Sequence, residues 1–101
     1  MHFVMSYDLR VPAGTRKKEL EQRITDVINP CKSVSVLSTF FIIHVDDKSE
    51  WERIRKGLTE ISTGIKETFY FVMSPLMDGG KYNGWLPNDN WSPINEITNL
   101  D

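Results

Sequence analysis

Residues 33–45 read SVSVLSTFFIIHV, and this stretch decides how the chain is interpreted. It is rich in Val, Ile and Phe, the residue types that are favoured in strands, and it is too long for a single average strand. Ser38 and Thr39 interrupt the apolar residues near the middle, where a chain reversal is expected. The stretch therefore predicts a β-hairpin.

A strand and a helix are predicted before the hairpin. Residues 2–9 alternate two sets of side chains, with the period of a strand. Pro12 and Gly14 then interrupt the chain, and Thr15 is placed to cap a helix. Apolar residues recur at helical spacing until Pro30 ends the pattern. The apolar positions of this helix are Leu20, Ile24, Val27 and Ile28.

A second helix and a last strand are predicted after the hairpin. Ser49 and Glu52 have the spacing of a capping box, and an apolar stripe at helical spacing follows them. Gly64 is placed to end this helix. Residues 68–74 are dense in aromatic residues and Val, which predicts a strand that Pro75 closes.

The resulting order β-α-β-β-α-β predicts an α+β fold, a ferredoxin-like plait with one antiparallel sheet and two helices on one face. With 101 residues the chain is expected to form one domain. We assign residues 1–75 to the ferredoxin-like domain and residues 76–101 to an irregular C-terminal tail. Because the strands carry apolar residues on both faces, the tail or another subunit is expected to cover the second face.

The tail is dense in turn signals and leaves room for at most one short strand, over residues 81–86. It also contains Tyr82, Trp85 and Trp91. A tail with two tryptophans is expected to dock on the domain or on a partner subunit. The three aromatic residues are candidate partner-binding residues, because such side chains can stack on bases or planar ligands. Covering the open sheet face is the alternative that we favour.

The formal net charge of −2 argues against strong nonspecific attraction to nucleic acid. The charge is unevenly distributed, since residues 1–32 contain six basic and four acidic side chains, whereas residues 76–101 contain one basic and four acidic ones. Any phosphate contact is therefore expected in the first half. The candidate nucleic-acid-binding residues are Arg10, Arg16, Lys17 and Lys18. A basic helix face is, however, more often simply solvated.

The sequence also indicates a compartment. Cys31 is the only cysteine, so neither an intrachain disulfide nor a thiolate metal cluster can form. The longest purely apolar run, residues 40–43, is far shorter than the roughly 20 residues of a membrane-spanning helix. The start of the chain lacks the basic region of a signal peptide. We expect a cytoplasmic protein that does not associate with a membrane.

Asp8 is the first candidate for chemistry, because it ends the first predicted strand just before a Pro/Gly loop. A carboxylate there can bind Mg²⁺ through water, and the twofold axis of a symmetric dimer can bring two copies together. In the alternative, Asp8 accepts hydrogen bonds from loop amides or pairs with Arg10. Sequence spacing alone favours this alternative.

Several short motifs of the chain resemble one family. They are SYDLR at residues 6–10, Pro12 and Gly14 after it, Leu20 and Ile24 in the first helix, and STFFI at residues 38–42. Together they resemble the SinR-like small proteins and their relatives, the Cas-two proteins of CRISPR adaptation. The resemblance covers residues 1–75.

The resemblance implies a ferredoxin-like homodimer packed through sheet faces. In the nuclease-active relatives it implies a metal-binding aspartate at the end of the first strand, which matches Asp8, with Tyr7 beside it. Asp8 and Tyr7 thus become the catalytic candidates, and Mg²⁺ becomes the candidate cofactor at Asp8. The chain departs from the family in its tail, which is longer, acidic and rich in Trp and Asn.

Two functional hypotheses follow, and they leave open whether the protein is an enzyme. The first is a nucleic-acid-related homodimer of the Cas-two and SinR-like type, either a Mg²⁺-dependent endonuclease with paired Asp8 carboxylates or an inactive relative that kept the dimer. The second is a non-enzymatic binding module, such as a viral or mobile-element inhibitor that occupies a host protein or a small nucleotide. The acidic tail and the modest basic content fit the second hypothesis better.

Overall fold

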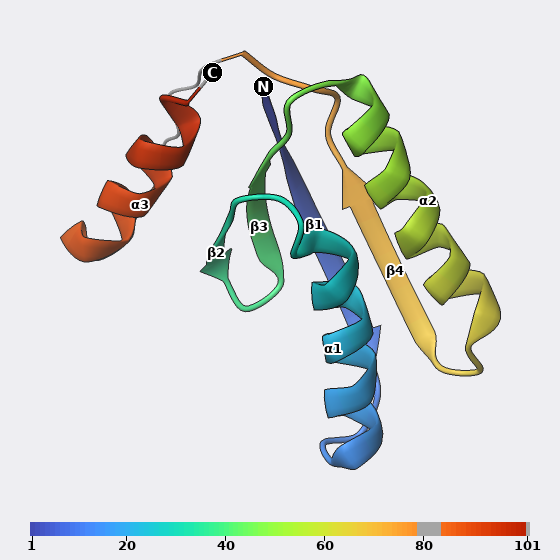
Figure 1. The fold of residues 1–101 in the computed structure, drawn as a ribbon. Helices are drawn as coiled ribbons and strands as arrows, with labels where there is room; N and C mark the ends of the chain where they lie inside the picture. The colour runs from blue at the N-terminus through green and yellow to red at the C-terminus, as the bar shows by residue number, and fades with distance from the viewer. Residues whose placement is uncertain (79–83, 101) are drawn as a thin grey trace.

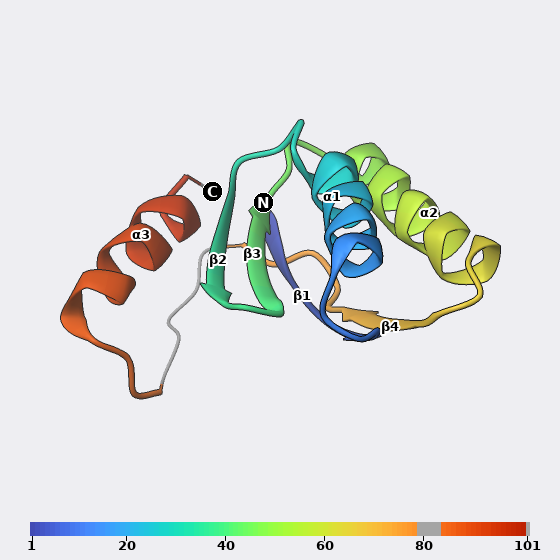
Figure 2. The ribbon, with the colours of Figure 1, turned by 90° about the horizontal axis from the view of Figure 1, so that it is seen from below.

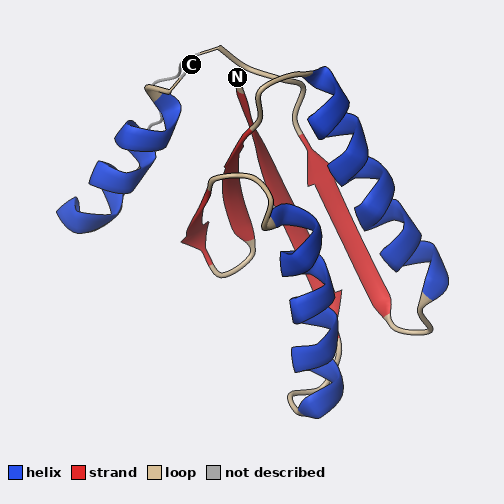
Figure 3. Ribbon diagram, viewed as in Figure 1, coloured by secondary structure: helices blue, strands red, loops and turns tan. Residues whose placement is uncertain are grey.

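The computed structural model describes residues 1–78 and 84–100, and these residues form four strands and three helices (Figure 1). In chain order the elements are β1 (His2–Arg10), α1 (Thr15–Ile28), β2 (Ser33–Leu37), β3 (Phe40–His44), α2 (Lys48–Gly64), β4 (Thr68–Met73) and α3 (Asn88–Thr98). The strands and helices predicted over residues 2–74 are all present in this order. Figure 3 separates them by type.

The four strands form one open antiparallel sheet in the order β2-β3-β1-β4. Strand β1 is central, because β3 pairs with its first half and β4 with its second half. Val4 lies opposite Ile42 on β3, and Asp8 lies opposite Tyr70 on β4. The predicted hairpin is confirmed, with β2 and β3 joined through Ser38 and Thr39.

Helices α1 and α2 cover one face of the sheet (Figure 2). Apolar side chains from both layers form the main core, and they include Phe3, Met5, Ile43 and Phe69 from the strands and Ile24, Ile28, Ile54 and Leu58 from the helices. Fully burying such a side chain stabilises the fold by about 1.5–3 kcal/mol. The two helices approach closely at Gly57, where an added Cβ would lie 2.9 Å from Val27 Cγ1.

The helix starts differ in detail from the sequence prediction. The cap of α1 is Gly14, whose φ of 148° favours glycine, and Thr15 is the first helical residue instead of the cap. The cap of α2 is Asp47, two residues before the predicted Ser49, and its carboxylate accepts hydrogen bonds from the backbone N–H groups of Ser49 and Glu50. A carboxylate can accept several such bonds, which explains why Asp47 takes this position.

The prediction of an irregular tail is wrong for residues 88–98, which form α3. Helix α3 lies on the other face of the sheet, beside β2 and β3 (Figure 2). Ile94 and Ile97 are buried against Ile42 there, so the tail covers part of the second face. Pro93 lies inside this helix, where proline is rare because it has no backbone N–H to donate.

The rest of the tail is only partly described. Residues 84–86 form no strand, and residues 81–83 of the short strand predicted over 81–86 lie outside the described residues. Met77 pairs with His2 at the start of β1 through two backbone hydrogen bonds of 3.1 and 2.7 Å. The chain therefore returns to the sheet directly after the predicted domain boundary at residue 75. No helix in residues 1–78 and 84–100 combines the length and the apolar character that crossing a membrane requires.

Candidate functional site

Part of the second sheet face is exposed, because α3 packs mainly on β2 and β3, with Val4 of β1 at the edge of the contact. The register places Ser6 opposite Val72 and Asp8 opposite Tyr70 in the uncovered part. Val72 is 73% exposed and Tyr70 is 61% exposed, so the edge strand β4 presents two large side chains with apolar surface to solvent on this face. We call the surface formed by Ser6, Asp8, Arg10, Tyr70 and Val72 the open patch.

Asp8 is held by Arg10 at the end of this patch. Arg10 Nε donates a hydrogen bond of 2.7 Å to Asp8 Oδ2, and the Arg10 guanidinium lies 5.5 Å from the centre of the Tyr70 ring. The hydrogen bond to Asp8 raises the pKa of Arg10. The pairing with Arg10, which the sequence left as one of two interpretations, is thus present, and it forms an ion pair on the exposed side of the sheet.

One protomer alone does not fit a magnesium ion at Asp8. Within residues 1–78 and 84–100, no group of three or more His, Cys, Asp or Glu side chains could hold a metal ion. The single carboxylate at this position is already engaged by Arg10. A cation at Asp8 would displace Arg10 from this carboxylate, unless a second chain brought a further carboxylate to the site.

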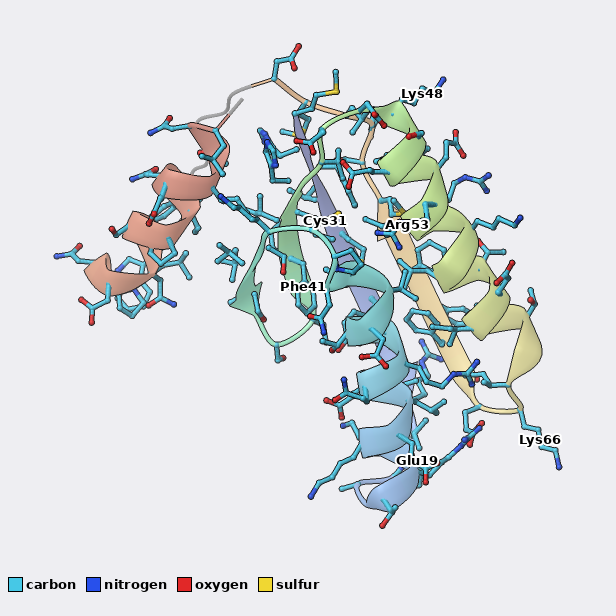
Figure 4. All side chains as sticks on the ribbon, in the orientation of Figure 1. Glu19, Cys31, Phe41, Lys48, Arg53 and Lys66 are labelled. Atoms are coloured by element: carbon cyan, nitrogen blue, oxygen red, sulfur yellow. The ribbon has the colours of Figure 1, made fainter. Side chains whose placement is uncertain are left out.

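Tyr7, the second catalytic candidate, points away from Asp8. Its ring lies on the helix-covered side, stacked on Phe41 at a centroid distance of 6.0 Å and edge-on to Phe69 at 5.7 Å. Phe41 is labelled in Figure 4. Burial and the nearby Glu21 carboxylate raise the pKa of the Tyr7 hydroxyl. Side chains of a strand alternate between faces, but Tyr7 and Asp8 both line one depression of about 290 Å³ near the end of β1.

The four basic candidates differ in their surroundings. Arg16 donates two hydrogen bonds to Glu67, of 2.6 and 3.1 Å, and a third of 3.4 Å to Glu19. Arg10 and Arg16 are therefore both engaged in ion pairs. Lys17 and Lys18 form no ion pair with a described residue, so they are the two cations of this group that remain available.

The aromatic residues of the tail also divide. Trp91 is half-buried in the cluster under α3, whereas Trp85 is 87% exposed. Tyr82 lies outside the described residues. Trp85 and Trp91 line an apolar groove of about 240 Å³ between α3 and the β2–β3 hairpin, together with Leu37, Phe40 and other apolar residues.

Cys31 shows no sign of a nucleophile. It is a half-buried residue whose thiol donates to Glu50 Oε2 at 3.4 Å, and Arg53 Nη2 lies 3.8 Å from the sulfur (Figure 4). Burial and the Glu50 carboxylate raise the pKa of the thiol. A raised pKa keeps the thiol protonated, which makes it a poor nucleophile.

Sequence reasoning missed Tyr70 and Val72 as members of a site. Their alternation with Phe69 and Phe71 is visible in the sequence, but their position beside Asp8 depends on the pairing of β4 with β1.

Comparison of the chain with protein-family models, with curated proteins and with solved structures finds no match.

Proposed function

We propose that the chain forms a nucleic-acid-related homodimer of the Cas-two and SinR-like kind, with the open patch as its dimer interface. The proposal includes a ferredoxin-like arrangement, which the chain order β-α-β-β-α-β and the sheet order β2-β3-β1-β4 support. The observation that carries the interface is the exposure of Val72 and Tyr70 around the Asp8–Arg10 ion pair.

A twofold interface suits the chemistry of this patch. In such an interface each residue meets the same surface of the second copy, so a patch that carries both charges is complementary to itself. Asp8 can then pair with Arg10 of the partner subunit, while Val72 and Tyr70 lose contact with water. Burial of apolar surface contributes about 25 cal/mol for each Å².

Between the two forms of the proposal, the geometry favours an inactive relative that kept the dimer. A Mg²⁺-dependent endonuclease would need Arg10 to leave Asp8 and the two Asp8 carboxylates to meet at the twofold axis. The inactive form needs neither change. Lys17 and Lys18 supply the positive charge for a nucleic-acid contact in both forms.

Sedimentation velocity at micromolar concentration tests the dimer, for which we expect twice the monomer mass of 11.7 kDa. Val72→Asp should give the monomer, because two added carboxylates would face each other in the interface. Leu37→Asp is the matched control, since Leu37 is an exposed apolar residue outside the patch and its replacement should leave the dimer intact. A wild-type protein that stays monomeric contradicts the proposal.

Anisotropy titrations with labelled RNA and DNA test the nucleic-acid contact. We expect binding that weakens with added salt and that falls in a Lys17→Gln, Lys18→Gln double variant. Incubation of the same substrates with Mg²⁺ separates the two forms of the proposal. Cleavage that Asp8→Asn abolishes would establish the endonuclease, whereas binding without cleavage would establish the inactive form.

The apolar groove supports a second candidate, a non-enzymatic binding module such as a viral or mobile-element inhibitor. Trp85 is exposed at the edge of this groove and is free to stack on a planar ligand. Titration with small nucleotides should then quench tryptophan fluorescence, and the quenching should disappear in Trp85→Phe. Quenching that persists in a Trp85→Phe, Trp91→Phe double variant would remove the groove from consideration.

A further inference from the structure

A polar depression of about 290 Å³ lies on the helix-covered side of the sheet, where β1, α1 and the β2–β3 turn meet. Its polar lining consists of Tyr7 and Asp8 from β1, Lys17 and Glu21 from α1, and Ser38 and Thr39 from the turn. The turn lies beside α1 in both views of the ribbon (Figures 1 and 2). A hydrogen bond of 3.0 Å from the Tyr7 backbone N–H to the Thr39 carbonyl fixes the turn against β1.

Asp8 is paired with Arg10, but the other polar side chains of this depression form no hydrogen bond or ion pair with a described residue. Lys17 and Glu21 lie one helical turn apart, yet neither forms an ion pair with a described residue. Lys17 is half-buried, whereas the neighbouring Lys18 is exposed. The Tyr7 hydroxyl makes no hydrogen bond within residues 1–78 and 84–100, although ring contacts with Phe41 and Phe69 hold its orientation.

These groups form a chemically mixed set. Lys17 brings a positive charge with three donors, and Glu21 brings an acceptor-only carboxylate. The hydroxyls of Tyr7, Ser38 and Thr39 can both donate and accept. Burial and Glu21 raise the pKa of Tyr7, so its hydroxyl keeps its proton at neutral pH and remains a donor. A ligand that carries both an anionic group and hydroxyl groups would satisfy all of them.

We propose that this depression binds a ribose phosphate, with the phosphate at Lys17 and the ribose hydroxyls at Glu21, Tyr7 and Thr39. A lysine ammonium is a common phosphate ligand, and a carboxylate accepts hydrogen bonds from sugar hydroxyls. The volume lies at the lower end of the range for small-molecule sites, about 300–1,000 Å³, and suits one nucleotide. The ribose phosphate is either a free mononucleotide or the terminal nucleotide of an RNA strand.

Asp8 of the open patch also lines this depression, but the residues proposed to contact the ribose phosphate are Lys17, Glu21, Tyr7 and Thr39, and none of them belongs to the patch. The two proposals can therefore fail separately. The monomeric Val72→Asp variant should bind a ribose phosphate as well as the wild type does.

Calorimetric titration of the full chain tests the site with four probes: adenosine 5′-monophosphate, its 2′-deoxy analogue, inorganic phosphate, and an RNA oligonucleotide with a 5′-phosphate. We expect the monophosphate to bind, and the 2′-deoxy analogue to bind about fivefold more weakly, because it lacks one hydrogen-bonding hydroxyl. Tighter binding of the oligonucleotide than of the monophosphate would identify the strand end as the source. Equal affinity would identify the free nucleotide.

Four variants locate the binding. Lys17→Gln and Glu21→Gln should each weaken the binding of the monophosphate by about tenfold or more, since each removes a charge-assisted hydrogen bond. Tyr7→Phe keeps the aromatic ring but loses the hydroxyl, and it should lower the affinity for the monophosphate by about fivefold. Lys56→Gln, which removes the charge of an exposed lysine on α2, is the matched control and should leave the affinity unchanged. Amide NMR spectra of each variant establish that the fold is intact.

Three results would overturn the proposal. The first is the absence of binding by every probe at millimolar concentration. The second is equal weakening by Lys17→Gln and Lys56→Gln, which would indicate general electrostatic attraction. The third is inorganic phosphate binding as tightly as the monophosphate, which would leave no role for the ribose.

Discussion

Arg16 holds Glu67 in a two-pronged ion pair, with Nε 2.6 Å from Oε2 and Nη2 3.1 Å from Oε1. The pair joins the start of α1, near Glu19, to the loop between α2 and β4, near Lys66 (Figure 4). The hydrogen bonds from Arg16 lower the pKa of Glu67 from 4.5 to about 2. The pair therefore links two parts of the chain that are far apart in sequence.

The first prediction concerns the pH dependence of stability. Because the folded-state pKa of Glu67 is depressed, the ion pair stabilises the protein fully above the unfolded-state value of 4.5. This contribution is lost as the pH falls towards about 2. The melting temperature of the wild type should therefore fall more steeply over this range than that of Glu67→Gln.

Glu19→Gln is the control for this measurement, because Glu19 makes only one contact with Arg16, at 3.4 Å. Its melting profile should follow the wild type. Parallel profiles of Glu67→Gln and the wild type below pH 4.5 would show that the ion pair does not form in solution.

The second prediction concerns the contact between α1 and α2. Gly57→Ala places a methyl group 2.9 Å from Val27 Cγ1, so the helices must shift. Overpacking costs about 1–3 kcal/mol, and the better helix propensity of Ala offsets about 1 kcal/mol of this. We expect a net loss of about 1 kcal/mol in the free energy of unfolding, measured with urea.

Gly64→Ala is the matched substitution, since no atom lies within 4 Å of its added Cβ. It should leave the stability unchanged or raise it. If Gly57→Ala is as stable as Gly64→Ala, the helices are not in close contact at this point.

The third prediction concerns the docking of α3. Ile94 is 2% exposed and packs against Ile42, so Ile94→Ala should lower the free energy of unfolding by about 2–5 kcal/mol. Urea unfolding followed by circular dichroism measures this loss. The exposed Ser92→Ala in the same helix should change the stability by less than about 0.5 kcal/mol. Equal effects of the two changes would mean that α3 is not docked on the sheet.

The fourth prediction separates the tryptophans. Trp85 is 87% exposed, whereas Trp51 is half-buried and donates a hydrogen bond of 3.1 Å to the Ser74 carbonyl. Trp85→Phe should therefore remove most of the fluorescence that acrylamide quenches, and Trp51→Phe should not. Unchanged quenching in Trp85→Phe would reveal that another chain or segment covers Trp85 in solution.

The sequence predicted the strands and helices of residues 2–74 because their apolar residues repeat with clear periods. It missed α3 because Pro93 and the turn-forming Asn88 and Asn90 obscured the helical spacing of Trp91 and Ile94. Proline and asparagine are both typical of loops. In the folded chain, burial of the apolar side chains outweighs these local preferences.

The candidate site was only partly predictable. The place of Asp8 near the end of a strand follows from the sequence, and so does the opposite orientation of Tyr7, because neighbouring strand residues face opposite sides. The position of Asp8 opposite Tyr70 cannot be predicted from the sequence, because it depends on the register between β1 and β4. Pairing registers arise from the whole sheet and are not encoded near either strand.

Along β1, odd-numbered and even-numbered residues face opposite sides of the sheet. The odd-numbered side chains from Phe3 to Leu9 pack on the side covered by α1 and α2, whereas the even-numbered side chains from Val4 to Arg10 lie on the opposite side. Substitutions at even positions beyond Val4 can therefore alter the outer surface without disturbing the main core. Insertion of one residue before Ser6 would instead exchange the two sets, placing Asp8 among aromatic rings and Tyr7 in water.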